Sequence, residues 1–162
     1  MFSKVLIANR GVIACRIIRT LRRMKVASVT VYSEVDRHSL HVEQADEAVL
    51  IGPAPAGLSY LSIPALLDAA RKAGAEAIHP GYGFLSENAD FAEACAKNGL
   101  VFIGPSPQHL RMFGLKHTAR QIAADAKIKL DELDPLETGP LQPDSYENAM
   151  RRNAEALVRA LR

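Results

Sequence analysis

Short apolar runs alternate with segments of helical periodicity over the first 115 residues, and this alternation limits the fold more than any other feature of the chain. Runs rich in apolar and β-branched residues occupy residues 4–9, 26–33, 47–52, 76–79 and 100–103. Runs of this length are typical of strands buried on both faces of a parallel sheet. Between the first two runs, apolar side chains recur at helical spacing at Ile13, Ile17 and Leu21.

The same spacing predicts helices at residues 12–24, 39–44, 63–72, 90–97 and 108–113, with a further one at 116–126. Strands that alternate with helices build βαβ units with right-handed crossovers. The sequence therefore predicts an α/β fold over residues 1 to about 115, with a doubly wound, mostly parallel five-stranded sheet that is Rossmann-like.

Composition narrows the class of protein further. The chain is 48% apolar and 23% charged, as in ordinary globular proteins, and it has no apolar stretch long enough to cross a membrane. A net charge of +2 does not indicate nucleic-acid binding. With no secretory signal and only two cysteines, Cys15 and Cys95, we expect reduced thiols and a cytoplasmic location.

Seven cations and no acidic residue precede Glu34. An organelle transit peptide can have this charge pattern, but the segment is poor in serine and has the pattern of strand, turn and helix. Arg16, Arg19 and Arg23 share one face of the predicted helix. That face is either solvated or an interface with an anionic partner or a second subunit.

Residues 127–162 differ in composition from the rest of the chain. Residues 127–143 are charged and then rich in glycine and proline, which predicts a linker. Residues 144–162 begin with a capping box and predict an amphipathic C-terminal helix, with Tyr146, Met150, Leu157 and Leu161 near one face. This helix either packs on the body of the domain or remains a solvated tail.

Two turns follow predicted strands. In an open α/β sheet, ligands bind beyond the carboxyl ends of the strands. The first turn, residues 9–12, lacks the G-x-G-x-x-G fingerprint, so NAD binding is not expected and a plain structural turn is the main alternative. The second, residues 79–88, combines two glycines, two aromatic rings, a histidine and a carboxylate. It is either a binding site or a tight loop with His79 bonded to backbone.

These segments together resemble the N-terminal domain of biotin carboxylase. The resemblance covers residues 1–126, and its most specific part is the run from His79 to Asn88. The amino-acid sequence of residues 114–120 is similar to that of urea carboxylases. The other matching segments are residues 4–11, 13–14, 45–48, 51–55, 59–61, 77–78, 102–105 and 114–116.

The resemblance implies a share in the carboxylation of biotin with Mg-ATP and bicarbonate. In the family, the lysine that matches Lys116 contacts the nucleotide phosphates, and the loop of Gly81, Tyr82, Gly83 and Phe84 lies near biotin and phosphate. The helix that bears Arg16 and Arg19 contributes to a homodimer interface. Other carboxylase subunits or a biotin carrier protein are the implied partners.

The chain departs from the family pattern at two places. Val12 stands where the family usually has glutamate, and residues 127–162 do not resemble the family's continuation. The ATP-grasp and C-terminal regions, which carry the metal ligands, the general base and most ATP contacts, are not in this sequence. We therefore expect no catalytic residue and no metal ligand here, and no tightly bound cofactor.

The sequence thus predicts a truncated biotin carboxylase-like domain, of urea or acyl-CoA carboxylase type, that is inactive alone. Two alternatives remain open. The chain is a non-catalytic assembly module that docks on an intact carboxylase, or it is one subunit of a split enzyme. The carboxyl acceptor is not determined by the sequence.

Overall fold

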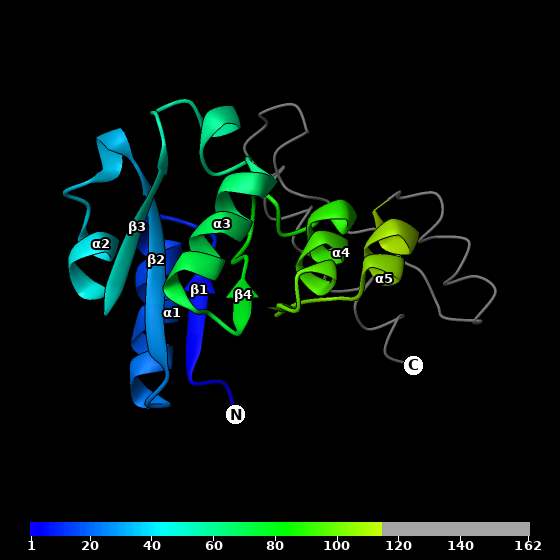
Figure 1. Ribbon diagram of the computed structural model, residues 1–162, viewed down its shortest axis with the longest axis horizontal. Coiled ribbons are helices and arrows are strands. Elements are labelled where there is room, and N and C mark those ends of the chain that lie inside the picture. The colour runs from blue at the N-terminus through cyan, green and yellow to red at the C-terminus, as the bar shows by residue number, and fades with distance from the viewer. Residues whose placement is uncertain (115–162) are drawn as a thin grey trace, which may run out of the picture. The chain divides into compact units, whose positions relative to one another are not determined.

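The structure is a computed structural model that describes residues 1–114 (Figure 1). The predicted helix at 116–126, the linker at 127–143 and the helix at 144–162 lie outside these residues, and so does Lys116. The chain divides into two units, Met1–Met112 and Phe113–Arg162.

Strands and helices alternate along the described residues as the sequence predicts. The strands are β1 (Lys4–Ile7), β2 (Ala27–Ser33), β3 (Glu47–Gly52), β4 (Ala77–His79) and β5 (Val101–Phe102). The helices are α1 (Gly11–Arg23), α2 (Leu40–Gln44), α3 (Ile63–Ala73), α4 (Ala89–Lys97) and α5 (Pro107–Phe113). Short 3-10 turns at Glu34–Asp36 and Ala56–Leu58 flank β3 and its neighbour α2.

The strands form one parallel sheet in the order β3-β2-β1-β4-β5. The chain moves outward from β1 to β3, then returns to the other side of β1 with β4 and continues to β5. Strands β1 and β4 therefore flank the point where the direction of winding reverses. This order confirms the predicted doubly wound, Rossmann-like sheet, and ligands of such sheets bind at the switch point.

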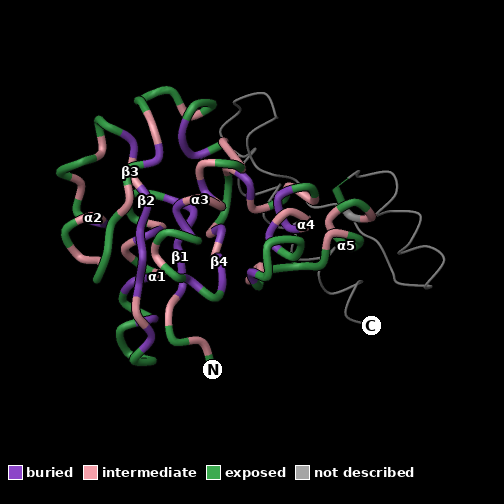
Figure 2. The backbone as a smooth tube through the Cα atoms, in the orientation of Figure 1, coloured by how far each residue is buried: buried purple, intermediate pink, exposed green. Residues whose placement is uncertain are grey.

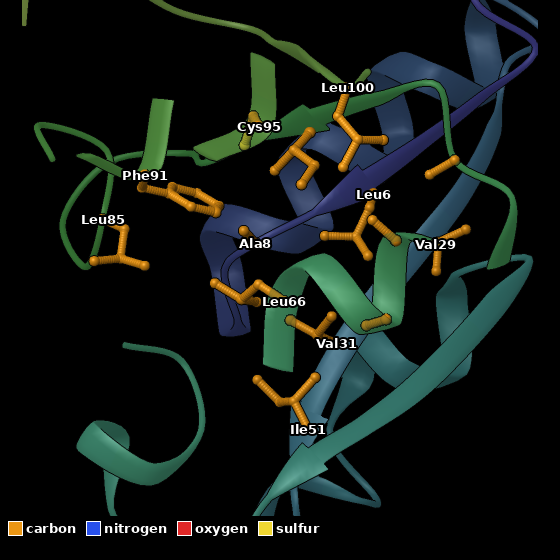
Figure 3. Close-up of a cluster of buried hydrophobic side chains, with 14 of the residues drawn as sticks. Leu6, Ala8, Val29, Val31, Ile51, Leu66, Leu85, Phe91, Cys95 and Leu100 are labelled. Carbon is orange, nitrogen blue, oxygen red and sulfur yellow. The ribbon is translucent and has the colours of Figure 1, made fainter. Parts of the chain in front are cut away.

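Alternate residues of each strand face opposite sides of the sheet. On one side, Leu6, Val29 and Ile78 pack against α3 and α4, and we call this side the α3 face. Its helices contribute fully buried Leu66 and Phe91 to a single cluster (Figure 3). Figure 2 shows burial concentrated along β1, β2 and β4. The α3 face holds most of the hydrophobic core.

The opposite side, which we call the α1 face, is covered by α1 and α2. Val5, Ile7 and Ala77 pack there against Ala14 and Ile18 of α1 in a smaller cluster. Helix α2 contacts α1 and β2. Beside α1, part of this face is uncovered and forms a groove of about 560 Å³, which is lined in part by Ile17, Leu21 and Ile103.

Local signals explain where the helices begin and end. The Ser62 hydroxyl accepts a hydrogen bond from the Ala65 amide at the start of α3, and Gly74 ends that helix with a left-handed backbone. Asn88 caps α4 by accepting from the Phe91 amide at 2.8 Å. Among the described residues, no helix is long and apolar enough to span a membrane.

Candidate functional site at the sheet switch point

The carboxyl edge of the sheet brings together the two turns that the sequence singles out. Asn9 and Arg10 follow β1, and the loop from Pro80 to Phe84 follows its neighbour β4. The Ala8 amide donates to the His79 carbonyl at 2.9 Å, so pairing between the two strands continues up to the loop. Both turns therefore border the switch point.

Asn9 holds the beginning of the loop from inside. Its buried Nδ2 donates to the carbonyls of Pro80 at 2.8 Å and Tyr82 at 2.9 Å, while its Oδ1 accepts from the Arg10 amide at 2.9 Å. Gly81 has φ +68°, and a Cβ at this position would lie 2.7 Å from an Ile13 methyl and 2.8 Å from Asn9 Nδ2. Only glycine fits here, because both the conformation and the space exclude a side chain.

His79 also binds the loop. Its Nδ1 accepts a hydrogen bond from the Gly81 amide at 3.0 Å, which requires the neutral ring with the proton on Nε2. Burial lowers the pKa of His79 and so favours this neutral form. The hydrogen bond between His79 and the backbone, one of the two alternatives from the sequence, is therefore present. His79 also lines the groove beside α1.

Phe84 ends the loop in an unusual conformation. Its φ of +42° is uncommon for a bulky residue and costs of order 1–3 kcal/mol. The ring stacks on Tyr60 with 5.1 Å between ring centres and 10° between planes. The Arg10 guanidinium lies over both rings, 5.3 Å from the Tyr60 centroid and 5.8 Å from that of Phe84. Stacking thus holds a strained residue in place.

Asp36 ties this aromatic stack to the sheet. One of its carboxylate oxygens, Oδ2, accepts from the Tyr60 hydroxyl at 2.6 Å, the Ser33 hydroxyl at 2.7 Å and Arg10 Nη1 at 3.2 Å. Burial alone raises the pKa of Asp36, but the hydrogen bonds from Tyr60, Ser33 and Arg10 outweigh it and lower the pKa. Burial, and then the contact with Asp36, raises the pKa of Tyr60 to about 12.

The middle of the loop faces outward. Tyr82 is 66% exposed, and a Cβ at Gly83 would meet nothing within 4 Å. Tyr82 and Gly81 also line the groove beside α1. The loop therefore presents an aromatic ring and open backbone at a site whose two ends are fixed.

The remaining predicted site residues lie in different places. Arg16 and Arg19 are exposed on α1, and Arg16 lines the groove. Val12 is 82% exposed in the first turn of α1, on the same edge as the loop. Within residues 1–114 no group of three His, Cys, Asp or Glu side chains could hold a metal ion.

Sequence reasoning missed the roles of Asn9, Arg10, Asp36 and Tyr60. Each makes contacts across more than twenty positions of sequence, from Arg10 to Asp36 and from Asn9 to Tyr82. No local pattern marks such contacts. Asn9 and Arg10 stand in the matching segment 4–11 and in the candidate turn 9–12, and Tyr60 stands in the matching segment 59–61. For Asp36 the sequence offered no signal.

Comparison with known proteins identifies the family. Residues 1–110 match the model of the biotin carboxylase N-terminal domain. The chain therefore belongs to this family, as its motifs predict.

Individual relatives agree with this assignment. The chain is 57% identical over 128 residues to the biotin carboxylase of Halalkalibacterium halodurans, covering 79% of this chain and 28% of the relative. It is similar in structure to the K. lactis urea amidolyase, with a TM-score of 0.78 and 53% identity over 80% of this chain and 8% of the other. The chain spans about a fifth of the length of the curated relatives it matches first.

One relative also aligns beyond the boundary that the sequence predicts. The α subunit of mouse methylcrotonoyl-CoA carboxylase is 49% identical over 152 residues, which is 94% of this chain and 20% of the relative. An alignment of this length must extend past residue 126. The boundary at residue 126 and the separate origin of residues 127–162 stay predictions.

Proposed function

We propose that this chain forms the N-terminal part of a biotin carboxylase component and takes part in the ATP- and bicarbonate-dependent carboxylation of biotin. The observation that carries the proposal is the loop from Gly81 to Phe84, held at the switch point of a sheet that belongs to this family. In the full enzymes the family uses ATP, magnesium and biotin. We propose that the isolated chain is inactive.

The described residues suit a biotin-binding role better than a nucleotide-binding one. The exposed Tyr82 ring offers an apolar face, and the open space at Gly83 allows a ligand to approach the backbone. Asn9 and His79 would keep the loop in position, and Gly81 leaves no gap beneath it. We assign the phosphate contact to Lys116 on the family resemblance alone.

The test is a domain replacement in the Halalkalibacterium halodurans biotin carboxylase. Its N-terminal segment is exchanged for residues 1–126 of this chain. We expect the folded chimera to hydrolyse ATP in a biotin- and bicarbonate-dependent manner, and this chain alone to show no such hydrolysis. A folded but inactive chimera would contradict the proposed role. Biotin-stimulated phosphate release by the chain alone would contradict its inactivity.

The chain alone is expected to bind ATP with a dissociation constant weaker than millimolar. One charge-assisted contact from Lys116 supplies about 1–3 kcal/mol, whereas micromolar affinity requires about 8 kcal/mol. Isothermal titration calorimetry with Mg-ATP measures this directly. Micromolar binding that disappears in Lys116→Ala would show that the chain alone forms a nucleotide site.

We further propose a homodimer through α1, with other carboxylase subunits or a biotin carrier protein as additional partners. Arg16 and Arg19 are exposed on the outer side of this helix, and Arg16 lies beside the apolar groove. Reversing both charges in Arg16→Glu/Arg19→Glu should shift the solution mass from dimer to monomer. A mass that is monomeric in the unmodified chain contradicts the homodimer.

The proposed division of the chain is a family domain at residues 1–126, a linker at 127–143 and a helix at 144–162. Limited proteolysis with mass spectrometry tests this division, because cleavage is expected within the linker. The cytoplasm is the proposed location, since two cysteines are too few for a disulfide framework; cell fractionation tests it. The alternatives for the carboxyl acceptor are urea and an acyl-CoA, and acceptor-dependent turnover of the complete enzyme decides between them.

A further inference from the structure

We infer that Arg10 and Asp36 are positioning residues that set the outer half of the Gly81–Phe84 loop, acting through the Tyr60–Phe84 stack. The use of the loop for a ligand rests on the proposed function. The coupling between Arg10, Asp36 and the loop rests on contacts within this chain, and it can be tested without any ligand.

The two ends of the loop are held by different parts of the molecule. Asn9 and His79 hold Pro80, Gly81 and the Tyr82 carbonyl through three hydrogen bonds. Beyond Tyr82 these contacts end. Gly83 has open space around it, and the ring stack at Phe84 is what anchors the outer half.

The stack in turn depends on Arg10 and Asp36. The guanidinium covers the ring faces of both Tyr60 and Phe84, and its Nη1 is paired with Asp36 at 3.2 Å. Asp36 also accepts from the Tyr60 hydroxyl at 2.6 Å. The carboxylate therefore orients the arginine and the tyrosine at the same time, and both of these contact Phe84.

Phe84 needs this support because its backbone is in the left-handed region, where a large side chain is disfavoured. Without the stack, the loop would relax toward an ordinary φ, and the Gly83 carbonyl would turn. That carbonyl accepts from the Ser86 amide at 2.9 Å. Amide exchange at Ser86 therefore reports the state of the outer half of the loop.

The experiment compares Arg10→Lys with Arg37→Lys in the full chain by hydrogen exchange measured with NMR. Lysine keeps the charge and can still pair with Asp36, but it lacks the planar group that lies over the rings. Arg37 is the matched control, because its guanidinium lies 5.7 Å from the Tyr32 ring and forms a cation–π contact of the same kind away from the loop.

In Arg10→Lys we expect exchange at Ser86 to become about tenfold faster, the loss expected for two cation–π contacts. Gly81 should change less, since Asn9 and His79 hold its end of the loop. The amides of Ala8 and Ile103, which donate to carbonyls of β4, should accelerate less than the amide of Ser86. Arg37→Lys should leave Ser86 at the wild-type rate.

Two results would overturn the inference. One is wild-type exchange at Ser86 in Arg10→Lys. The other is acceleration at Ala8 and Ile103 as large as that at Ser86, which indicates a general loss of stability. Asp36→Asn gives a second, nearly isosteric test and should also accelerate Ser86 selectively. If the chimera described above is inactive while Ser86 responds as expected, the proposed function fails and the positioning role stands.

Discussion

The two faces of the sheet are built from the same strands, but the α3 face is covered more completely than the α1 face. On the α3 face, Leu6, Val29 and Ile78 meet two helices and belong to a large buried cluster. On the α1 face, β1 still contributes Val5 and Ile7, but β2 and β4 carry smaller or polar side chains. These are Ser28, Thr30 and Ala77, and part of the face remains an open groove. One face is thus closed by its own chain, and the other retains surface on which further contacts can form.

Buried polar groups without a hydrogen-bond partner lie on the α1 side, although Ser28 on that side is paired with Asp46 at 2.7 Å. The Tyr60 hydroxyl, at the margin of the α3 face, is paired with Asp36 and with the Ser33 amide. On the α1 side, both ring nitrogens of His41 and the Thr30 hydroxyl are buried with no hydrogen-bond partner within the described part of the chain. An unpaired buried group destabilises a fold, whereas a paired one does not. The α3 face should therefore dominate stability.

The largest expected effect is the loss in free energy of unfolding when a leucine on each face is replaced by alanine. Leu66→Ala leaves an enclosed cavity on the α3 face and should lower the free energy of unfolding by about 4 kcal/mol. Leu21→Ala only widens a groove that is already open, so the transfer free energy alone is lost, about 2 kcal/mol. Urea unfolding of both variants measures the difference. Equal losses would show that the two faces are equally well packed.

A smaller effect is expected for removal of the Tyr60 hydroxyl. In Tyr60→Phe, the Ser33 amide loses its acceptor and Asp36 loses one donor, which should cost about 1–3 kcal/mol. Tyr32→Phe is the matched control, since no hydrogen bond of its hydroxyl is found among residues 1–114. Both are compared by chemical unfolding at neutral pH. If the two variants are equally stable, the hydrogen bonds of Tyr60 contribute nothing.

The smallest effect concerns His41 and depends on pH. Burial lowers the pKa of His41 below the ordinary value of about 6.5. Between the folded and unfolded pKa values, the unfolded chain binds more protons than the folded chain. The neutral His41 ring therefore makes its full contribution to the free energy of unfolding above about pH 6.5, and this contribution is lost as the pH falls through the folded pKa. His79, whose pKa is also lowered, acts in the same direction.

Replacing the ring should weaken this dependence. His41→Leu removes both unpaired nitrogens at similar volume, so we expect its free energy of unfolding to equal or slightly exceed that of the wild type at pH 8. Between pH 6.5 and 5 the variant should lose less stability than the wild type. Thermal melts across this range measure both quantities. Parallel curves for the two proteins would show that His41 does not contribute to acid sensitivity.

The order of strands and helices could be predicted from the sequence, because it depends on local patterns. Apolar runs such as residues 4–9 and helical stripes such as Ile13, Ile17 and Leu21 have the periods of strand and helix themselves. The family could also be predicted, since the run from His79 to Asn88 is specific. Glycines at 81 and 83 marked the loop correctly, although the reason that Gly81 must be glycine lies in Asn9 and Ile13.

The tertiary structure alone decided how the site is held. Asp36 meets Tyr60, Arg10 meets Phe84, and Asn9 meets Tyr82 only because the sheet order places the ends of β1 and β4 side by side and β2 next to β1. Strand order depends on the summed burial of both faces, to which each residue contributes little and which no short window of sequence contains. Local pattern therefore determined the elements and the family, and packing determined which side chains set the loop.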